Sequence, residues 1–204
     1  MRLAVFTGAA IVCLVSGLAS AEESISFKRI ELDLYFRSEG VATADVNKDG
    51  KQDVVVGDYW YENPDWTPHE IRKPRKPNRG GYTEAFAVYA KDFNRDGWTD
   101  VLVIPFHGKD AKWYENPQNK SGHWMERVAF KGTGNETRLY ADLFSDGQPV
   151  FLMGVAGHMS WVGAPSDPTA PWPVHKIDPG RHAADKYYHG LGVGDINGDK
   201  LKDV

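Results

Sequence analysis

The residues with the clearest chemistry form three turns that share one pattern of side-chain oxygens. Each turn reads Asp-x-Asn-x-Asp and carries a further Asp at its ninth position. Carboxylate and amide oxygens at alternate positions of a tight turn are the ligands that Ca²⁺ prefers. We therefore predict structural calcium sites in loop 1 (residues 45–53), loop 2 (92–100) and loop 4 (195–203). The expected ligands are Asp45, Asn47, Asp49 and Asp53 in loop 1, Asp92, Asn94, Asp96 and Asp100 in loop 2, and Asp195, Asn197, Asp199 and Asp203 in loop 4.

A turn built from Asp, Asn and Gly can also be simply polar, without a cation. Three carboxylates within nine residues argue against that alternative, because each like-charge pair at about 4 Å costs about 4 kcal/mol at an effective dielectric constant near 20. An EF-hand is excluded because Val56 and Val103 stand at the twelfth position, where its Glu ligand would be. Mg²⁺ fits less well, since it demands near-octahedral geometry and keeps its waters.

The sixth position of each turn decides how sharply the backbone can bend. Gly50 and Gly97 occupy this position in loops 1 and 2, and glycine tolerates the required conformation without steric cost. Loop 4 has Lys200 there, and we expect Gly198 to relieve its turn.

The turns recur at intervals of about 50 residues, and other features keep the same order. A degenerate copy, loop 3 (142–150), has Phe144 and Val150 at two ligand positions, so we predict no metal there. In each full repeat the turn lies between a small apolar segment and an apolar run, and two Trp-containing segments follow. We interpret these features as four short strands, with the second buried on both faces and the fourth at an exposed edge. The predicted repeats span residues 37–83, 84–133, 134–185 and, truncated, 186–204.

Four-stranded units that repeat in order and stack on one another make a β-propeller. The turn with its following apolar strand resembles the FG-GAP/VCBS repeat of integrin-alpha-type propellers over about residues 25–204, although the Phe-Gly-Gly-Ala-Pro element is absent. The resemblance implies an all-β fold with calcium-binding inter-strand loops. It also implies a binding or recognition module for carbohydrate or extracellular protein ligands. Because propellers have four to eight blades, we expect about three and a half blades of a seven-bladed ring here, with residues 27–30 as an outer strand.

Three histidines are expected on the rim opposite the calcium loops. His107 and His158 lie between predicted second and third strands, and His189 just precedes a first strand. As candidate catalytic residues they could hold Zn²⁺ or another divalent ion, or serve in acid–base chemistry. The competing interpretation is that they are ordinary polar loop residues. Residues 189–195, together with the Trp-Tyr-Glu-Asn-Pro segments, resemble propellers of the aldos-2-ulose dehydratase type, which makes a metal-dependent keto-sugar lyase the alternative to a binding module.

The aromatic residues of the repeat are assigned structural roles. Trp60, Trp113 and Trp161 recur at one place in the unit, which favours packing between blades over sugar platforms. His69 and His175 fall at matching places on the predicted outer strands, where we also expect a structural role.

The first 21 residues have the features of a secretory signal peptide: a basic start, an apolar stretch and a small-residue cleavage site ending at Ala21. The mature protein is thus expected to be extracellular or periplasmic, without membrane insertion. Cys13 is the chain's one cysteine and leaves with the peptide, which excludes disulfides and thiolate chemistry. With 24 Lys and Arg against 28 Asp and Glu, the chain has no basic excess, so nucleic-acid binding is not expected.

Overall fold

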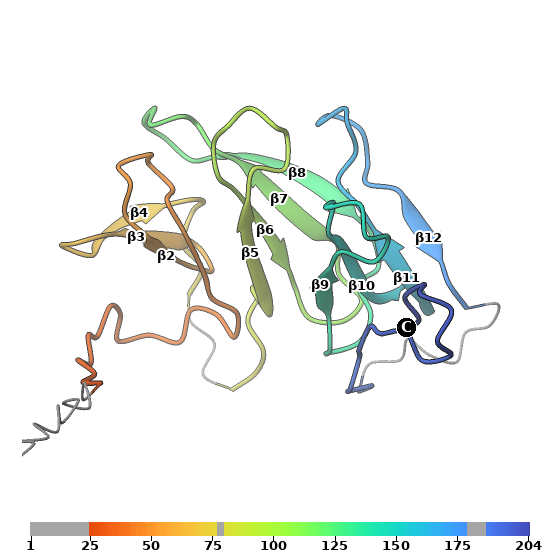
Figure 1. Cartoon of the computed structure of the whole chain (residues 1–204). Coiled ribbons are helices and arrows are strands. Elements are labelled where there is room, and N and C mark those ends of the chain that lie inside the picture. The colour runs from red at the N-terminus through yellow and green to blue at the C-terminus, as the bar shows by residue number, and fades with distance from the viewer. Residues whose placement is uncertain (1–24, 77–79, 179–186) are drawn as a thin grey trace, which may run out of the picture. The chain divides into compact units, whose positions relative to one another are not determined.

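The computed structural model describes residues 25–76, 80–178 and 187–204, which contain β-strands and no helix. They form three four-stranded antiparallel sheets, each with its strands in sequence order (Figure 1). Blade 1 holds β1 (Ala42–Ala44), β2 (Asp53–Val56), β3 (Tyr59–Glu62) and β4 (Thr67–Glu70). Blade 2 holds β5 (Ala87–Lys91), β6 (Asp100–Ile104), β7 (Ala111–Glu115) and β8 (Met125–Phe130). Blade 3 holds β9 (Leu139–Ala141), β10 (Val150–Val155), β11 (His158–Val162) and β12 (Val174–Lys176).

The predicted all-β fold of four-stranded units is therefore confirmed, and each sheet lies within one predicted repeat. In this part of the chain no helix is long and apolar enough to cross a membrane. Loop 4 closes with an isolated bridge between Gly194 and Asp203. The first strand that the sequence predicts just after His189 is thus reduced to that single pairing.

The described residues fall into two units, residues 25–31 and the described part of 32–204. The predicted signal peptide lies outside the described residues. The described part of the first unit, residues 25–31, has no regular secondary structure. The strand expected at 27–30 is therefore not formed here, since backbone N–H and C=O groups make a strand only against a paired neighbour.

The three blades share one register. Val55 pairs with Trp60, Leu102 with Trp113 and Leu152 with Trp161. Because side chains alternate between the two faces of a strand, this register places the three tryptophans at equivalent sites of their sheets.

Buried side chains of adjacent blades form shared clusters. As expected for strands covered on both faces, every residue of β6 and β10 is buried. Trp60 packs in a cluster that includes Val88 and Val101 of blade 2, and Trp113 in one that includes Phe151 of blade 3. The predicted inter-blade role of these two tryptophans is confirmed.

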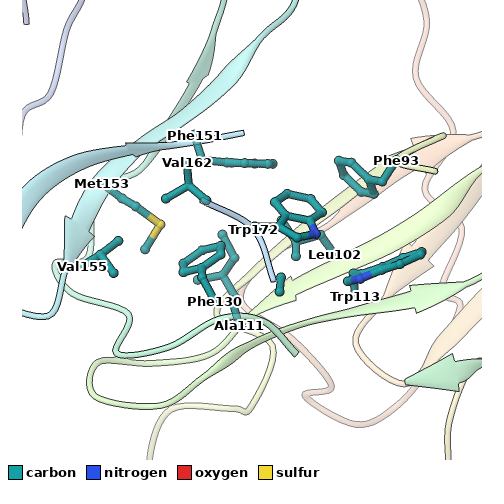
Figure 2. Packing of buried hydrophobic residues seen from close by; sticks show 12 residues of the cluster. Phe93, Leu102, Ala111, Trp113, Phe130, Phe151, Met153, Val155, Val162 and Trp172 are labelled. Carbon is teal, nitrogen blue, oxygen red and sulfur yellow. The ribbon is translucent and has the colours of Figure 1, made fainter. Parts of the chain in front are cut away.

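A second set of tryptophans ties each blade to the one before it. The backbone N–H of Trp124 donates to Ile71 O in blade 1, and that of Trp172 donates to Ala129 O in blade 2, both at 2.9 Å. Figure 2 shows Trp172 beside Phe93 and Phe151, with ring centroids 5.2 and 6.1 Å away. The segments leading into β8 and β12 thus insert their indoles into the core cluster shared with the preceding blade.

Candidate functional site

Loop 1 connects β1 to β2 and is organised by its own side-chain oxygens. Asp45 accepts hydrogen bonds from the backbone N–H groups of Asp49 (3.1 Å) and Gly50 (2.9 Å), one on each carboxylate oxygen. Asn47 Oδ1 also accepts the N–H of Asp49, at 3.0 Å. These bonds fold the turn back on its first residue, so the side-chain oxygens of positions one, three and five lie along one short segment.

The same turn is built in the other loops. In loop 2, Asp92 accepts the N–H groups of Asp96 and Gly97 at 3.1 and 2.8 Å, and loops 3 and 4 repeat this pattern around Asp142 and Asp195. The repeat detected in the sequence therefore corresponds to one recurring backbone conformation.

Left-handed backbone occurs at two places in each loop. In loop 1 these are Lys48 (φ 64°) and Gly50 (φ 84°). In loop 4 they are Gly198 (φ 83°) and Lys200 (φ 70°). Gly198 thus occupies the place of Lys48 and does not relieve the sixth position, where Lys200 itself adopts a conformation unfavourable for a residue with a Cβ.

The aspartates at the ninth position lie apart from the turn side chains. Asp53 is fully buried, with Oδ2 accepting the N–H of Val46 (2.9 Å) and Oδ1 that of Asn63 (3.0 Å). The equivalent Asp100 accepts the N–H groups of Phe93 and Asn116. Each carboxylate therefore clamps the start of its loop to the end of the third strand.

Burial makes one of these carboxylates a weaker acid than an ordinary aspartate. Desolvation raises the pKa of Asp100 to about 7, although the backbone N–H bonds from Asn116 and Phe93 act in the opposite direction. A nearby cation would favour the ionised form of this group.

The donor chemistry of the turns fits a hard cation. Asp45, Asn47 and Asp49 offer oxygen atoms only, and a carboxylate that accepts an N–H keeps further lone pairs for a metal. Among the described residues, no group of three or more His, Cys, Asp or Glu side chains is arranged to hold a metal, so Asp53 is not gathered with Asp45 and Asp49. Its role as a ligand, like the calcium sites themselves, stays a prediction.

In blades 1 and 2, a glutamate that the sequence analysis did not single out connects the turn to the outer strand. Glu62 Oε1 accepts the side-chain amide of Asn47 (2.9 Å), and its Oε2 lies 2.8 Å from His69 Nε2. In blade 2, Glu115 takes the same place between Asn94 and Arg127. The signal for this glutamate in the sequence was its recurrence directly after Trp-Tyr. The contact also explains why Asn stands at the third position of the turn, because its Oδ1 accepts a backbone N–H and its Nδ2 donates to the glutamate carboxylate.

His69 and His175 lie against tryptophans of the neighbouring strand. The Trp60 and His69 rings stack with centroids 4.2 Å apart, and the Trp161 and His175 rings with centroids 3.8 Å apart. These contacts support the structural role expected for both histidines.

Residues of blades 1 and 2 line a cleft of about 790 Å³ next to loop 1. Its polar lining includes two carboxylates that contact histidines. Glu62 contacts His69 as described above, and Glu70 Oε2 lies 2.8 Å from His123 Nε2 across the blade boundary. The lining residues that matter here are Asn47, Trp60, Glu62, His69, Glu70 and His123.

The predicted rim histidines are placed separately. His107 is exposed on the turn after β6, His158 Nδ1 lies 3.4 Å from Asp178 Oδ1, and His189 Nε2 lies 3.3 Å from Glu136 Oε2. The described residues thus pair two of the histidines with different carboxylates and gather no three-residue metal group.

The carboxylates of this rim join neighbouring blade connections. Glu39 accepts the N–H of Thr83, Glu84 pairs with Arg75 and Lys109, and Glu136 accepts the hydroxyl of Tyr82. These contacts give Glu39, Glu84 and Glu136 structural partners.

The fold and the repeated turns define a protein built from consecutive β-propeller blades. Residues 39–63 match the family model described as the FG-GAP repeat, and this segment holds β1, loop 1, β2 and β3. The predicted FG-GAP repeat is thus confirmed at this position of the chain. No curated protein and no solved structure matches the chain.

Proposed function

We propose that this protein is a secreted, calcium-stabilised FG-GAP propeller that binds a carbohydrate or an extracellular protein. The observation that carries the proposal is the FG-GAP match over loop 1 together with the same turn in each successive repeat. The resemblance to this repeat implies a binding module in an extracellular protein. The extracellular location agrees with the signal peptide that the sequence predicts.

Calcium in this proposal has a structural task. A bound cation would offset the repulsion between clustered carboxylates. Asp45, Asn47 and Asp49 would hold it in loop 1, and Asp92, Asn94 and Asp96 in loop 2. Asp53 and Asp100 then support the turn, since each holds together the N–H of the second residue of its turn and the end of the third strand.

The cleft between blades 1 and 2 is the proposed ligand site. Its volume of about 790 Å³ is within the usual range for small-molecule sites. Carboxylates, imidazoles and amides in a lining that includes Trp60 provide donors and acceptors for hydroxyl groups. This lining suits a sugar or a polar protein loop, and the lyase alternative stays a prediction from the sequence.

Thermal unfolding with calcium and with chelator tests the structural role. We expect the melting temperature to rise with calcium over about 10⁻⁴–10⁻³ M, the range of extracellular sites. A melting temperature that is the same with excess calcium and with chelator would count against the proposal.

A glycan array and a panel of extracellular matrix proteins test ligand binding. We expect a bound ligand to be lost in the Glu70→Ala variant, which changes the cleft, and kept in Glu31→Ala, which changes an exposed acid outside it. Binding that is equally strong in both variants would rule out the cleft as the site.

A further inference from the structure

Three consecutive carbonyl groups of loop 1 accept hydrogen bonds from blade 2. These are the carbonyls at the first, second and third positions of the turn, which are the positions that begin the predicted metal site. All three bonds measure 3.0 Å and come from side chains. They are Thr99 Oγ1 to Asp45 O, Asn116 Nδ2 to Val46 O, and Asn119 Nδ2 to Asn47 O.

Thr99 is part of loop 2 and Asn116 is bonded to it, while Asn119 follows Gln118, whose side-chain amide donates to Asp96 of loop 2 at 3.1 Å. Thr99 is the eighth residue of loop 2, and Asn116 donates to both Thr99 O and Asp100 Oδ1, each at 2.9 Å. Asp100 in turn accepts the N–H of Phe93, the second residue of loop 2. A continuous set of hydrogen bonds therefore runs from the backbone of loop 2 to the backbone of loop 1.

A side-chain contact follows the same path. Lys48 Nζ, at the left-handed fourth position of loop 1, lies 4.3 Å from the centroid of the Trp98 ring in loop 2. Such a cation–π contact adds a modest attraction at a partly exposed position. The two turns thus touch through side chains as well as through the backbone.

We propose that loops 1 and 2 bind calcium with positive cooperativity, with Thr99, Asn116 and Asn119 as the positioning residues that couple them. This inference rests on the calcium sites of the proposed function. Ordering either turn fixes these three donors or their acceptors, so the second turn has less conformational freedom left to lose. The coupling is reciprocal, because each site must change the affinity of the other by the same factor.

The other loops show where this coupling ends. Lys202, the eighth residue of loop 4, donates to Asp142 O, the first carbonyl of loop 3, which repeats the bond from Thr99 to Asp45. The eighth residue of loop 3 is Pro149, whose side chain has no donor. The link from loop 3 to loop 2 therefore cannot form in this way, which leaves loops 1 and 2 as one pair.

Calcium titration of the full chain, followed by amide NMR, resolves the two sites. The amides of Gly50 and Gly97 report on loops 1 and 2, because each donates to the first aspartate of its own turn. The Asp92→Asn/Asp96→Asn variant silences loop 2, and Asp45→Asn/Asp49→Asn silences loop 1. We expect each change to weaken binding at the other loop by at least about five-fold, by the same factor in both directions.

A second pair of variants tests the positioning residues. Thr99→Val with Asn119→Ala removes two of the three bonds while leaving every predicted ligand in place, and it is expected to bring the coupling factor close to one. Thr67→Val, on the exposed outer strand of blade 1, makes the same Thr-to-Val change away from the loops and should leave the factor unchanged.

The outcomes separate this inference from the proposal on which it rests. If neither glycine amide responds to calcium up to about 10 mM, well above the affinity range of such sites, both the calcium proposal and the coupling are wrong. If both sites bind but independently, the coupling alone is overturned. If coupling persists in Thr99→Val/Asn119→Ala, these residues do not carry it and the assignment is wrong.

Discussion

At the residue scale, the ninth-position aspartates combine burial with ionisable chemistry. Asp53 and Asp100 are both fully buried and bonded to backbone N–H groups of two different segments. A buried donor that loses its acceptor costs its full desolvation penalty. These residues should therefore matter for folding whether or not a cation is present.

Replacing Asp53 by Asn tests this role. The amide can accept only one of the two N–H groups that Asp53 holds, so we expect a loss of about 1–3 kcal/mol in the free energy of unfolding. Urea unfolding in excess chelator measures it without any contribution from metal. The matched change Asp49→Asn, at an exposed turn position, should cost less than about 1 kcal/mol in chelator. Equal losses would argue against the clamp.

The acidity of Asp100 gives a signed dependence on pH. Because its pKa is raised to about 7 in the folded protein, against about 3.9 when unfolded, the folded state binds a proton more tightly. Its contribution to stability is fully present below about pH 4 and is lost as the pH rises through about 7. In calcium-free protein, ¹³C NMR of the Asp100 carboxyl should give a midpoint near 7. A midpoint near 4 would contradict the effect of burial.

At the element scale, the connections between blades run close to the strands that they join. Gly134 donates to Gly154 O in β10 at 2.7 Å, and a Cβ at Gly134 would lie 2.6 Å from that oxygen. Gly40 is equally close to Ala87 and Val88 at β5. Glycine lets the segment entering blade 3 lie against β10 at Gly134, and lets the segment before β1 lie against β5 of blade 2 at Gly40.

The Gly134→Ala variant should therefore destabilise the protein. The new methyl group meets backbone atoms, which cannot rotate away, and we expect a cost of about 1–3 kcal/mol. Gly192→Ala is the control, since no heavy atom lies within 4 Å of its Cβ position. Chemical unfolding measures the stability of both variants. Similar stabilities would show that the backbone contact between Gly134 and Gly154 can accommodate a methyl group.

At the scale of the whole molecule, stability depends on indoles that cross from one blade to the next. Trp124 is 7% exposed and lies in the cluster built around Val55 and Ile71 of blade 1. Trp172 occupies the equivalent place in the cluster of blade 2. The blades are thus joined by side chains as well as by the loop-to-loop bonds.

Trp124→Ala should cost about 3–5 kcal/mol, because it empties a large space in the core that two blades share. Trp66→Ala, at the corresponding position of blade 1, removes a half-buried indole and should cost clearly less. Thermal unfolding monitored by circular dichroism distinguishes the two. Comparable losses of stability in the two variants would mean that burial between blades does not determine how much a tryptophan contributes.

Much of this protein could be predicted from local sequence. The turns require Asp, Asn and Gly at fixed spacing, and strands alternate their side chains, so loops 1 and 2 and the four strands of each blade were identifiable from periodicity. The inter-blade packing of Trp60 and Trp113 was also predictable, because a repeated large apolar residue must be buried against the next repeat.

Tertiary structure alone decided which atoms of these residues meet. Spacing could not show that Asp53 faces backbone N–H groups and not the turn's side-chain oxygens, that Glu62 joins Asn47 to His69, or that His158 and His189 have different carboxylate partners. Nor could it show that Asn116 reaches a carbonyl 70 positions earlier in the chain. Side-chain direction and the approach of one blade to another depend on packing between residues far apart in the sequence. A pattern read along the sequence reports only relations between residues that are close together in it.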